Sequence, residues 1–387
     1  MKKQKDIKKE QNKFLSYLKT LPKRYFIDAF TGMAQGLFVT LIAGTIIKTI
    51  GERLFDGTSI GAILVLLGQI ASILTGAGIG AGIANYLKAP KLVIFSAIVA
   101  GFVGAYAEQI IGAIVTYDSI KISFNGTLVS VTAFIGKGLP GNPISAYVSS
   151  LLAIELGCLV QGKTKLDILL VPLTCVLSAF VGCIISVPFI WLIKILSKGI
   201  DIATGAMPLI MGIIIAVIMG ILLTMPTSSA AIWVSIATGV TSENMLLAGG
   251  AAVVGCACHM VGFAVASYRE NGFSGLIAQG LGTSMLQIPN IMKKPIIMLP
   301  MIISSAICGP LSTCVFKLMC ADFGGGMGTS GLVGVFGVLA CKGQNPVLMW
   351  TGIVFLLFIL PAMLNIVISE FMRKKNWIKF GDMKLPD

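Results

Sequence analysis

Few side chains in this sequence could carry chemistry, and His259 comes first because it is the only histidine of the chain. It follows Cys256 and Cys258 within the apolar run 249–268. A zinc site wants four ligands with repeated cysteine or histidine spacing, and this run supplies three in apolar surroundings. We therefore expect no metal here. Two interpretations stay open: a packed imidazole bonded to a backbone carbonyl, or a ligand for a solute or a proton.

Glu155 is the second such residue because it lies deep inside an apolar run, far from any obvious aqueous end. A carboxylate at membrane depth is costly and usually faces a cavity or a partner. Glu155 and His259 together would suit a polyhydroxy ligand, since both form directional hydrogen bonds. Glu108 is similar but lies nearer the end of its run, so an interfacial position is an equal alternative.

Polar residues also gather at three places where the apolar pattern breaks, 136–157, 224–233 and 322–331. Transporter sites tend to lie at such breaks near the middle of the bilayer. In the first break, Asn142 before Pro143 would bring an amide and the free N–H groups of a helix start to one point. Plain loops between spans are the alternative for all three.

The second break contains Pro226, a residue favoured in the first turn of a helix. Thr227, Ser228 and Ser229 follow it, as helix caps or as ligands. The third break is too rich in glycine for a straight helix and indicates a re-entrant hairpin.

The elements that would position these residues are transmembrane helices. Of 387 residues, 56% are hydrophobic and 12% are charged, whereas a soluble domain is about a quarter charged. Apolar runs of about 20 residues, long enough to span the hydrocarbon as helices, recur along the chain. We therefore predict an all-α polytopic membrane protein with about ten transmembrane helices and re-entrant segments. The candidate spans are 27–50, 59–87, 91–116, 134–160, 166–193, 205–224, 227–268 (one long or two short passes), 273–290, 295–317, 323–342 and 346–371. The count is about ten because some of these segments look too broken to cross the bilayer fully.

The distribution of charge indicates the orientation. The net charge of +13 comes largely from the two ends of the chain. Such a bias is typical of cytoplasmic segments beside membrane lipid rather than of a nucleic-acid-binding surface. Both termini are therefore predicted to be cytoplasmic. The chain divides into a basic cytoplasmic N-terminal segment (1–25), a first transmembrane half (26–200), a second transmembrane half (201–372) and a basic cytoplasmic tail (373–387).

The two halves resemble each other. Four short segments of the first half match segments of the second half in the same order, at a spacing of about 180 residues. The pairs are 35–46 with 211–222, 80–86 with 262–268, 134–138 with 323–327, and 169–173 with 358–362. An odd number of spans in each half would make this an inverted repeat, which is a common plan of secondary transporters. The alternative is that glycine-rich apolar sequence aligns with itself easily.

Nothing in the sequence indicates a cofactor. Nine cysteines are scattered through mostly apolar runs, and an odd number in such positions argues against a disulfide framework. The glycine-rich run 76–84 follows no strand, so we interpret it as a close-packed helix face rather than a dinucleotide loop. No nucleophile–base constellation of an enzyme is visible.

Three runs carry a family resemblance: 28–51, 141–157 and 225–233. They resemble the membrane-subunit IIC family of the bacterial phosphotransferase system, in the branch that contains the perfringolysin O regulator. The resemblance implies about ten spans with re-entrant hairpins, a homodimer in the bacterial plasma membrane, and a sugar gripped by a glutamate and a histidine. Glu155 and His259 match those roles by type and setting. No fused IIA or IIB domain is found, so separate IIA and IIB proteins would supply phosphate.

These observations predict a permease subunit for a small polar solute, expected to be a sugar. Glu155, Asn142 and His259 would contact the solute, and Thr227, Ser228 and Ser229 would line the opposite side. The alternative is a membrane regulator or sensor of gene expression that uses the same pocket without transport. Its short basic N-terminal segment would then meet the regulatory partner.

Overall fold

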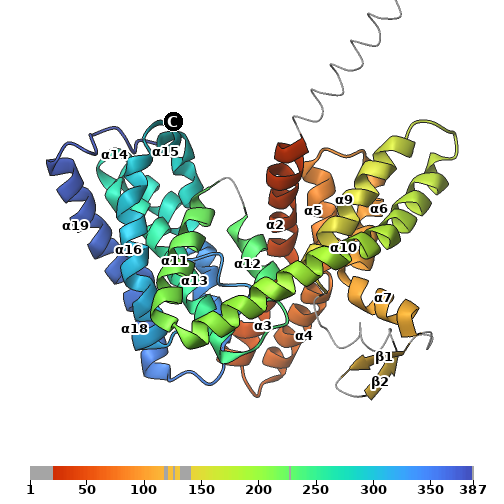
Figure 1. Cartoon of the computed structure of the whole chain (residues 1–387), viewed down its shortest axis with the longest axis horizontal. Helices are drawn as coiled ribbons and strands as arrows, with labels where there is room; N and C mark the ends of the chain where they lie inside the picture. Colours follow the sequence, from red (N-terminus) through yellow and green to blue (C-terminus); the bar gives the residue numbers. More distant parts are fainter. Residues whose placement is uncertain (1–20, 117–120, 125–126, 131–140, 226–227, 386–387) are drawn as a thin grey trace, which may run out of the picture.

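The computed structural model describes residues 21–116, 121–124, 127–130, 141–225 and 228–385. Helices make up nearly all of these ranges. The strands within them form an antiparallel hairpin of β1 (Lys121–Phe124) and β2 (Thr127–Ser130). The predicted all-α class is therefore confirmed for the described residues (Figure 1).

Six helices in the described ranges are long and apolar enough to cross a bilayer. They are Leu21–Leu54, Pro143–Val160, Asp167–Ala206, Glu243–Ala266, Pro295–Phe316 and Pro346–Lys374. A seventh candidate is the pair α4 (Ser59–Ile73) and α5 (Thr75–Tyr86), which is bent by 52°. A multi-pass membrane protein is confirmed, and the count of ten stays a prediction.

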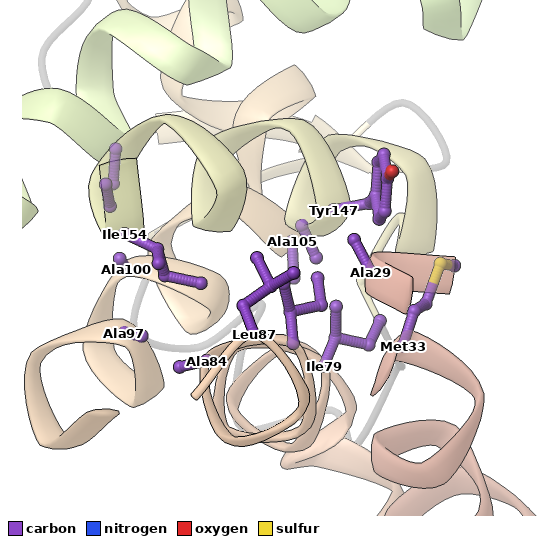
Figure 2. Packing of buried hydrophobic residues seen from close by; sticks show 14 of the residues in the cluster. Ala29, Met33, Ile79, Ala84, Leu87, Ala97, Ala100, Ala105, Tyr147 and Ile154 are labelled. Carbon is purple, nitrogen blue, oxygen red and sulfur yellow. The ribbon is translucent and has the colours of Figure 1, made fainter. Parts of the chain in front are cut away.

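The first bundle packs α2 (Ala29–Leu37), α5, α6 (Lys91–Ala105) and α9 (Pro143–Val160) around a core of alanine and a few larger side chains (Figure 2). Small residues let helix backbones approach closely in membrane proteins. A Cβ on Gly36 of α2 would lie 2.1 Å from the carbonyl oxygen of Gly78 in α5. Glycine is therefore required where these two helices touch.

The second bundle surrounds α13 (Glu243–Ala266) with α11 (Pro208–Thr224), α16 (Leu299–Pro310) and α19 (Leu360–Lys374). In the most apolar stretch of α13, 89% of the residues are buried inside the protein. A helix that is covered on all sides needs no polar face, which explains why its sequence is apolar and small all round.

The two bundles are joined by α10 (Asp167–Ala206), which crosses the molecule obliquely in Figure 1. Its 40 residues correspond to a length of about 60 Å at about 1.5 Å per residue. The predicted span 166–193 ended too early, because polar residues beyond it continue the helix until Pro208 starts α11. The hydroxyl of Ser242, which caps α13, donates a hydrogen bond to Asp201 of α10.

Two predicted spans are each divided into two helices. The span 91–116 breaks at Tyr106, between α6 and α7 (Ala107–Thr116). The span 227–268 contains the short α12 (Ser229–Ala237) and then α13.

Two other predicted spans are not continuous helices. The span 323–342 begins with turns, followed by η7 (Ser330–Leu332) and α17 (Val333–Ala340). The span 273–290 covers parts of four short elements, which are α14 (Tyr268–Ile277), η3 (Ala278–Gly282), η4 (Ser284–Gln287) and α15 (Ile288–Lys293). Gly328 and Gly331 have positive φ angles, in keeping with the break expected at 322–331. The span 273–290 is instead interrupted at Thr283, whose backbone is extended.

Candidate functional site

Two hairpins enter the second bundle from opposite ends of α13. The tail-side hairpin (residues 268–298) leaves the C-terminal end of α13, and its α14 and α15 lie beside the C-terminus in Figure 1. The glycine hairpin (residues 318–341) starts at the other end, where the N–H of Cys320 donates to the carbonyl oxygen of Leu246 at 3.0 Å. Each hairpin therefore directs its tip toward the middle of α13.

The two tips touch each other. The hydroxyl of Thr329 donates to the carbonyl oxygen of Gly280 at 2.6 Å, and that of Ser330 donates to the carbonyl oxygen of Gly282 at 2.8 Å. Hydrogen bonds of this length hold the ends of the hairpins together.

Both tips have the same five-residue pattern, Gly-x-Gly-Thr-Ser, at 280–284 and at 326–330. Sequence reasoning identified the second copy as part of a glycine-rich break and missed the first. The repeated pattern was the signal that could have found it, because it pairs two segments 46 positions apart. The structure shows that the two copies are direct neighbours.

A cavity of about 160 Å³ lies where the tips meet the first bundle. It is bounded on one side by the N-terminal helix Leu21–Leu54. On the other side it is bounded by both tips and the start of α12. No ionised side chain lines it, among the described residues. The lining residues are Thr31, Ala34, Phe38, Ile42, Leu223, Ser228, Ser229, Ala230, Thr283, Met285, Met327 and Ser330.

The predicted residues Ser228 and Ser229 both line this cavity at the first turn of α12. Ser228 is the N-cap, and its hydroxyl oxygen accepts the N–H of Ala231 at 3.1 Å. The hydroxyl of Ser229 donates to the carbonyl oxygen of Gly326 at 2.7 Å. Thr227 lies outside the described residues.

His259 is fully buried in α13 and does not line the cavity itself. Its Nδ1 is 2.9 Å from the hydroxyl oxygen of Thr224, which is 3.0 Å from the hydroxyl oxygen of Ser284. The neighbours Leu223 and Thr283 line the cavity itself. The imidazole thus bonds to a hydroxyl rather than to a backbone carbonyl, and it holds together the end of α11 and the tip of the tail-side hairpin.

The other edge of the imidazole packs on α11. A Cβ on Gly220 would lie 2.4 Å from Cδ2 and 2.8 Å from Nε2 of His259. Nε2 has no hydrogen-bond partner among the described residues. Across the described part of the chain, no group of three or more His, Cys, Asp or Glu residues is arranged to hold a metal ion.

Glu155 lies elsewhere, on α9 of the first bundle. Its Oε1 forms an ion pair with Nε of Arg24 at 2.9 Å. It lines a mostly apolar cavity of about 450 Å³ with Tyr147 of α9 and Phe189 of α10. Neither Ser228 nor His259 borders that cavity.

Asn142 lines a third cavity, of about 440 Å³. Its side-chain oxygen accepts the N–H groups of Ile144 and Ser145, so it caps α9 as the Asn142–Pro143 pair predicted. Its amide nitrogen donates to Glu108 at 3.2 Å. The five predicted site residues that the structure describes therefore do not share one cavity: Ser228 and Ser229 line the pocket at the tips, His259 is linked to that pocket through Thr224 and Ser284, and Glu155 and Asn142 line separate cavities.

A family model described as "Phosphotransferase system, EIIC" matches residues 27–385, which include both bundles and both hairpins. The comparisons with curated proteins and with solved structures gave no significant match.

Proposed function

The chain belongs to the phosphotransferase system EIIC family, and on that premise we propose that it carries a small polar solute, a sugar, across the plasma membrane. The observation that carries this proposal is the pocket at the two hairpin tips. Transporters commonly bind their solute where interrupted helices meet near the middle of the bilayer. The pocket lies where two interrupted segments meet, between the two bundles.

The lining of the pocket favours a neutral polyhydroxy solute. It offers hydroxyl groups from Thr31, Thr283 and Ser330, together with the apolar surfaces of Phe38 and Met327. Hydroxyls both donate and accept hydrogen bonds, which matches the hydroxyls of a sugar. A charged solute would lose its hydration without gaining an opposite charge.

His259 supports this site rather than contacting the solute. By bonding Thr224, it fixes the position of Ser284 and of the adjacent Thr283. The pocket of about 160 Å³ is smaller than the range of about 300–1,000 Å³ that is typical of small-molecule sites. The tips must therefore move apart before a hexose fits, and a hydrogen-bonded contact between hairpins provides a place for that movement.

The arrangement of the termini supports the predicted orientation. The start of α2 and the C-terminus lie at the same edge of the molecule (Figure 1). Lys294 pairs with Asp382 of the tail at 2.6 Å and so belongs to that edge. Positive residues mark the cytoplasmic side of a membrane protein. We infer that this edge is cytoplasmic and that both termini are inside the cell.

The proposed inverted repeat is supported by packing within each half. The matched segments 35–46 and 80–86 belong to helices that pack together in the first bundle, and 211–222 and 262–268 belong to helices that pack together in the second. The segment 134–138 lies outside the described residues. A homodimer, separate IIA and IIB partners and the branch of the perfringolysin O regulator remain expectations from the family resemblance.

The proposal is tested by ligand-induced stabilisation of the purified protein. The probes are glucose, mannose, galactose, N-acetylglucosamine and cellobiose. A sugar present at about 100 times its Kd should stabilise the wild type by about 2.7 kcal/mol. Thr283→Val removes one pocket hydroxyl at nearly constant volume, so it should weaken this stabilisation. Thr351→Val, on the exposed face of α18 (Pro346–Val354), is the matched control and should leave it unchanged.

Uptake then identifies the energy source. Uptake that requires phosphoenolpyruvate and a separate IIB protein supports a phosphotransferase subunit, whereas uptake driven by protons alone indicates a secondary carrier. Stabilisation by a sugar without any uptake would favour the regulator. If no sugar stabilises the protein, the sugar proposal is wrong.

A further inference from the structure

The cavity that contains Asn142 lies at the opposite end of α12 from the pocket at the tips. The first turn of α12 borders the pocket, and its last turn, with Ser235 and Ile236, borders this cavity. The helix has nine residues and is about 14 Å long, and its four residues 231–234 separate the two spaces. We name this second space the α12 cavity; its lining residues are Glu108, Asn142, Ile190, Ile193, Lys194, Ser197, Lys198, Asp201, Ser235, Ile236, Thr238, Gly239 and Val240.

The polar groups of the α12 cavity are arranged by contacts among themselves. The carboxylate of Glu108 accepts hydrogen bonds from Nζ of Lys194 at 2.6 Å and from the amide of Asn142 at 3.2 Å. These three groups come from three different helix segments, namely α7, α10 and the cap of α9. A carboxylate held on both oxygens is positioned before any ligand arrives, which lowers the entropic cost of binding.

The charge of the cavity selects a class of ligand. The lining contains two lysines and two carboxylates, so the formal charges of Lys194, Lys198, Glu108 and Asp201 balance. A balanced set gives no net attraction for an anion or a cation, while it offers many donors and acceptors to hydroxyl groups. The hydroxyl oxygen of Ser197 is buried without a partner among the described residues, which adds an unsatisfied group beside the cavity.

The size of the α12 cavity also suits a neutral ligand with several hydroxyl groups. Its volume of about 440 Å³ lies within the range of about 300–1,000 Å³ that is typical of small-molecule sites. The pocket at the tips, of about 160 Å³, is much smaller. A sugar that does not fit the closed pocket has room here.

We propose that the α12 cavity is a second binding site for the transported neutral sugar, on the side of α12 away from the pocket at the tips. This rests on the proposed function, since it assigns the second site to the same solute. Glu108 binds sugar hydroxyls, and Lys194 and Asn142 position it. The solute occupies the α12 cavity on one side of α12 and the pocket on the other.

Protection of an introduced cysteine tests this proposal. In a Cys158→Ser/Cys314→Ser background, which removes the two cysteines that are not buried among the described residues, Lys198→Cys is alkylated with N-ethylmaleimide. The probe is the sugar of the panel that stabilises the protein most. It should slow alkylation at Lys198→Cys at least threefold. Lys163→Cys, in the exposed loop between α9 and α10, is the matched control and should react at an unchanged rate.

Glu108→Gln in the Lys198→Cys background distinguishes local binding from a distant effect. Loss of one charged hydrogen bond should raise the sugar concentration for half-protection about tenfold. If the sugar stabilises the protein but does not protect Lys198→Cys, or if Glu108→Gln leaves the protection unchanged, the second site is wrong while the proposed function stands. If no sugar stabilises the protein, both are wrong.

Discussion

The two hairpins that meet at the pocket are held in place by different physical means. The tail-side hairpin is fastened by buried side-chain amides: Gln287 donates to Gln279 at 2.8 Å and to the carbonyl oxygen of Met383 at 2.9 Å. The glycine hairpin is fastened by backbone contact: a Cβ on Gly326 would lie 2.5 Å from the carbonyl oxygen of Ser229 in α12. One hairpin depends on polar partners, and the other depends on the absence of side chains.

Because of this difference, the two hairpins tolerate different structural changes. Hydrogen bonds between side chains can be broken and formed again, so the tail-side hairpin can be released without changing its backbone. Close backbone contacts have no such alternative, because any added atom must displace the neighbour. We infer that the tail-side hairpin is the one that moves when the pocket opens, and the following predictions test the two modes of attachment.

The largest effect is expected for Arg373→Met at the base of the tail-side hairpin. Its guanidinium binds both oxygens of Glu270, at 2.9 and 3.1 Å, and the side chain of Glu270 is 1% exposed. Removal of the arginine leaves a buried carboxylate, so the free energy of unfolding should fall by about 3–5 kcal/mol. Denaturant unfolding in detergent measures this loss.

The control for this variant is Arg269→Met. Arg269 pairs with Glu370 at 3.2 Å, but the pair is largely exposed, so its loss should cost less than about 1 kcal/mol. Equal losses in the two variants would show that burial does not set the strength of attachment at this hairpin.

The second effect is expected for Gly328→Ala in the glycine hairpin. Gly328 has a φ of +55°, and its Cβ would lie 2.7 Å from the backbone nitrogen of Ala257. The combined backbone penalty and overpacking should lower the free energy of unfolding by about 3 kcal/mol. The same unfolding assay measures it.

Gly343→Ala separates the two contributions. Gly343 has a φ of +87° but no atom within 4 Å of an added Cβ, so only the backbone penalty of about 1–2 kcal/mol applies. A loss at Gly328→Ala no larger than at Gly343→Ala would contradict the close-contact account of the glycine hairpin.

A smaller effect is expected for Gln287→Met in the amide network. The substitution keeps the side-chain length but leaves the carbonyl oxygen of Met383 and the side-chain oxygen of Gln279 without this donor. The expected loss of stability is about 1–3 kcal/mol. Gln35→Met, at an exposed position of α2, is the control and should stay within about 0.5 kcal/mol of the wild type. A neutral Gln287→Met would mean that the amides do not fasten the hairpin.

The smallest effect is a pH dependence from Asp382 in the tail. Burial raises the pKa of this carboxyl, but the hydrogen bonds from Lys294 and from the N–H of Lys379 outweigh burial and hold the pKa below its usual range. Its contribution to stability is therefore present above the unfolded pKa of about 3.9 and is lost as the pH falls through the lower folded pKa. Between pH 5 and pH 2.5, the wild type should lose more stability than Asp382→Asn. If the wild type and Asp382→Asn lose the same stability over this pH range, Asp382 is not the source of the pH dependence.

The two hairpins also differ in how much the sequence alone could predict. The glycine run 322–331 has an unmistakable composition, so its break from helix was predicted. The amide network was not predicted, because Gln287 and Met383 are 96 positions apart and single glutamines give no local pattern. The same reason explains why Glu155 was not paired with Arg24, 131 positions earlier.

For the site itself, the helix caps, which depend on neighbouring residues, were predicted from the sequence. Contacts between distant segments were not predicted. Ser228 and Asn142 cap helices at the breaks where proline and polar residues indicated helix starts. The role of His259 depends on Thr224 and Ser284, which come from two other elements. No periodicity in α13 could reveal those partners, because this helix is buried on every side.

The length of α10 makes the spacing of the two bundles depend on the thickness of the bilayer. Its apolar part, residues 167–193, is about 40 Å long at about 1.5 Å per residue. It lies within a hydrocarbon layer of about 30 Å only if it is inclined by about 40°. A thicker bilayer requires a more upright helix and draws the bundles together, and a thinner bilayer spreads them. The thickness of the surrounding bilayer thus changes the distance between the two bundles through the tilt of α10.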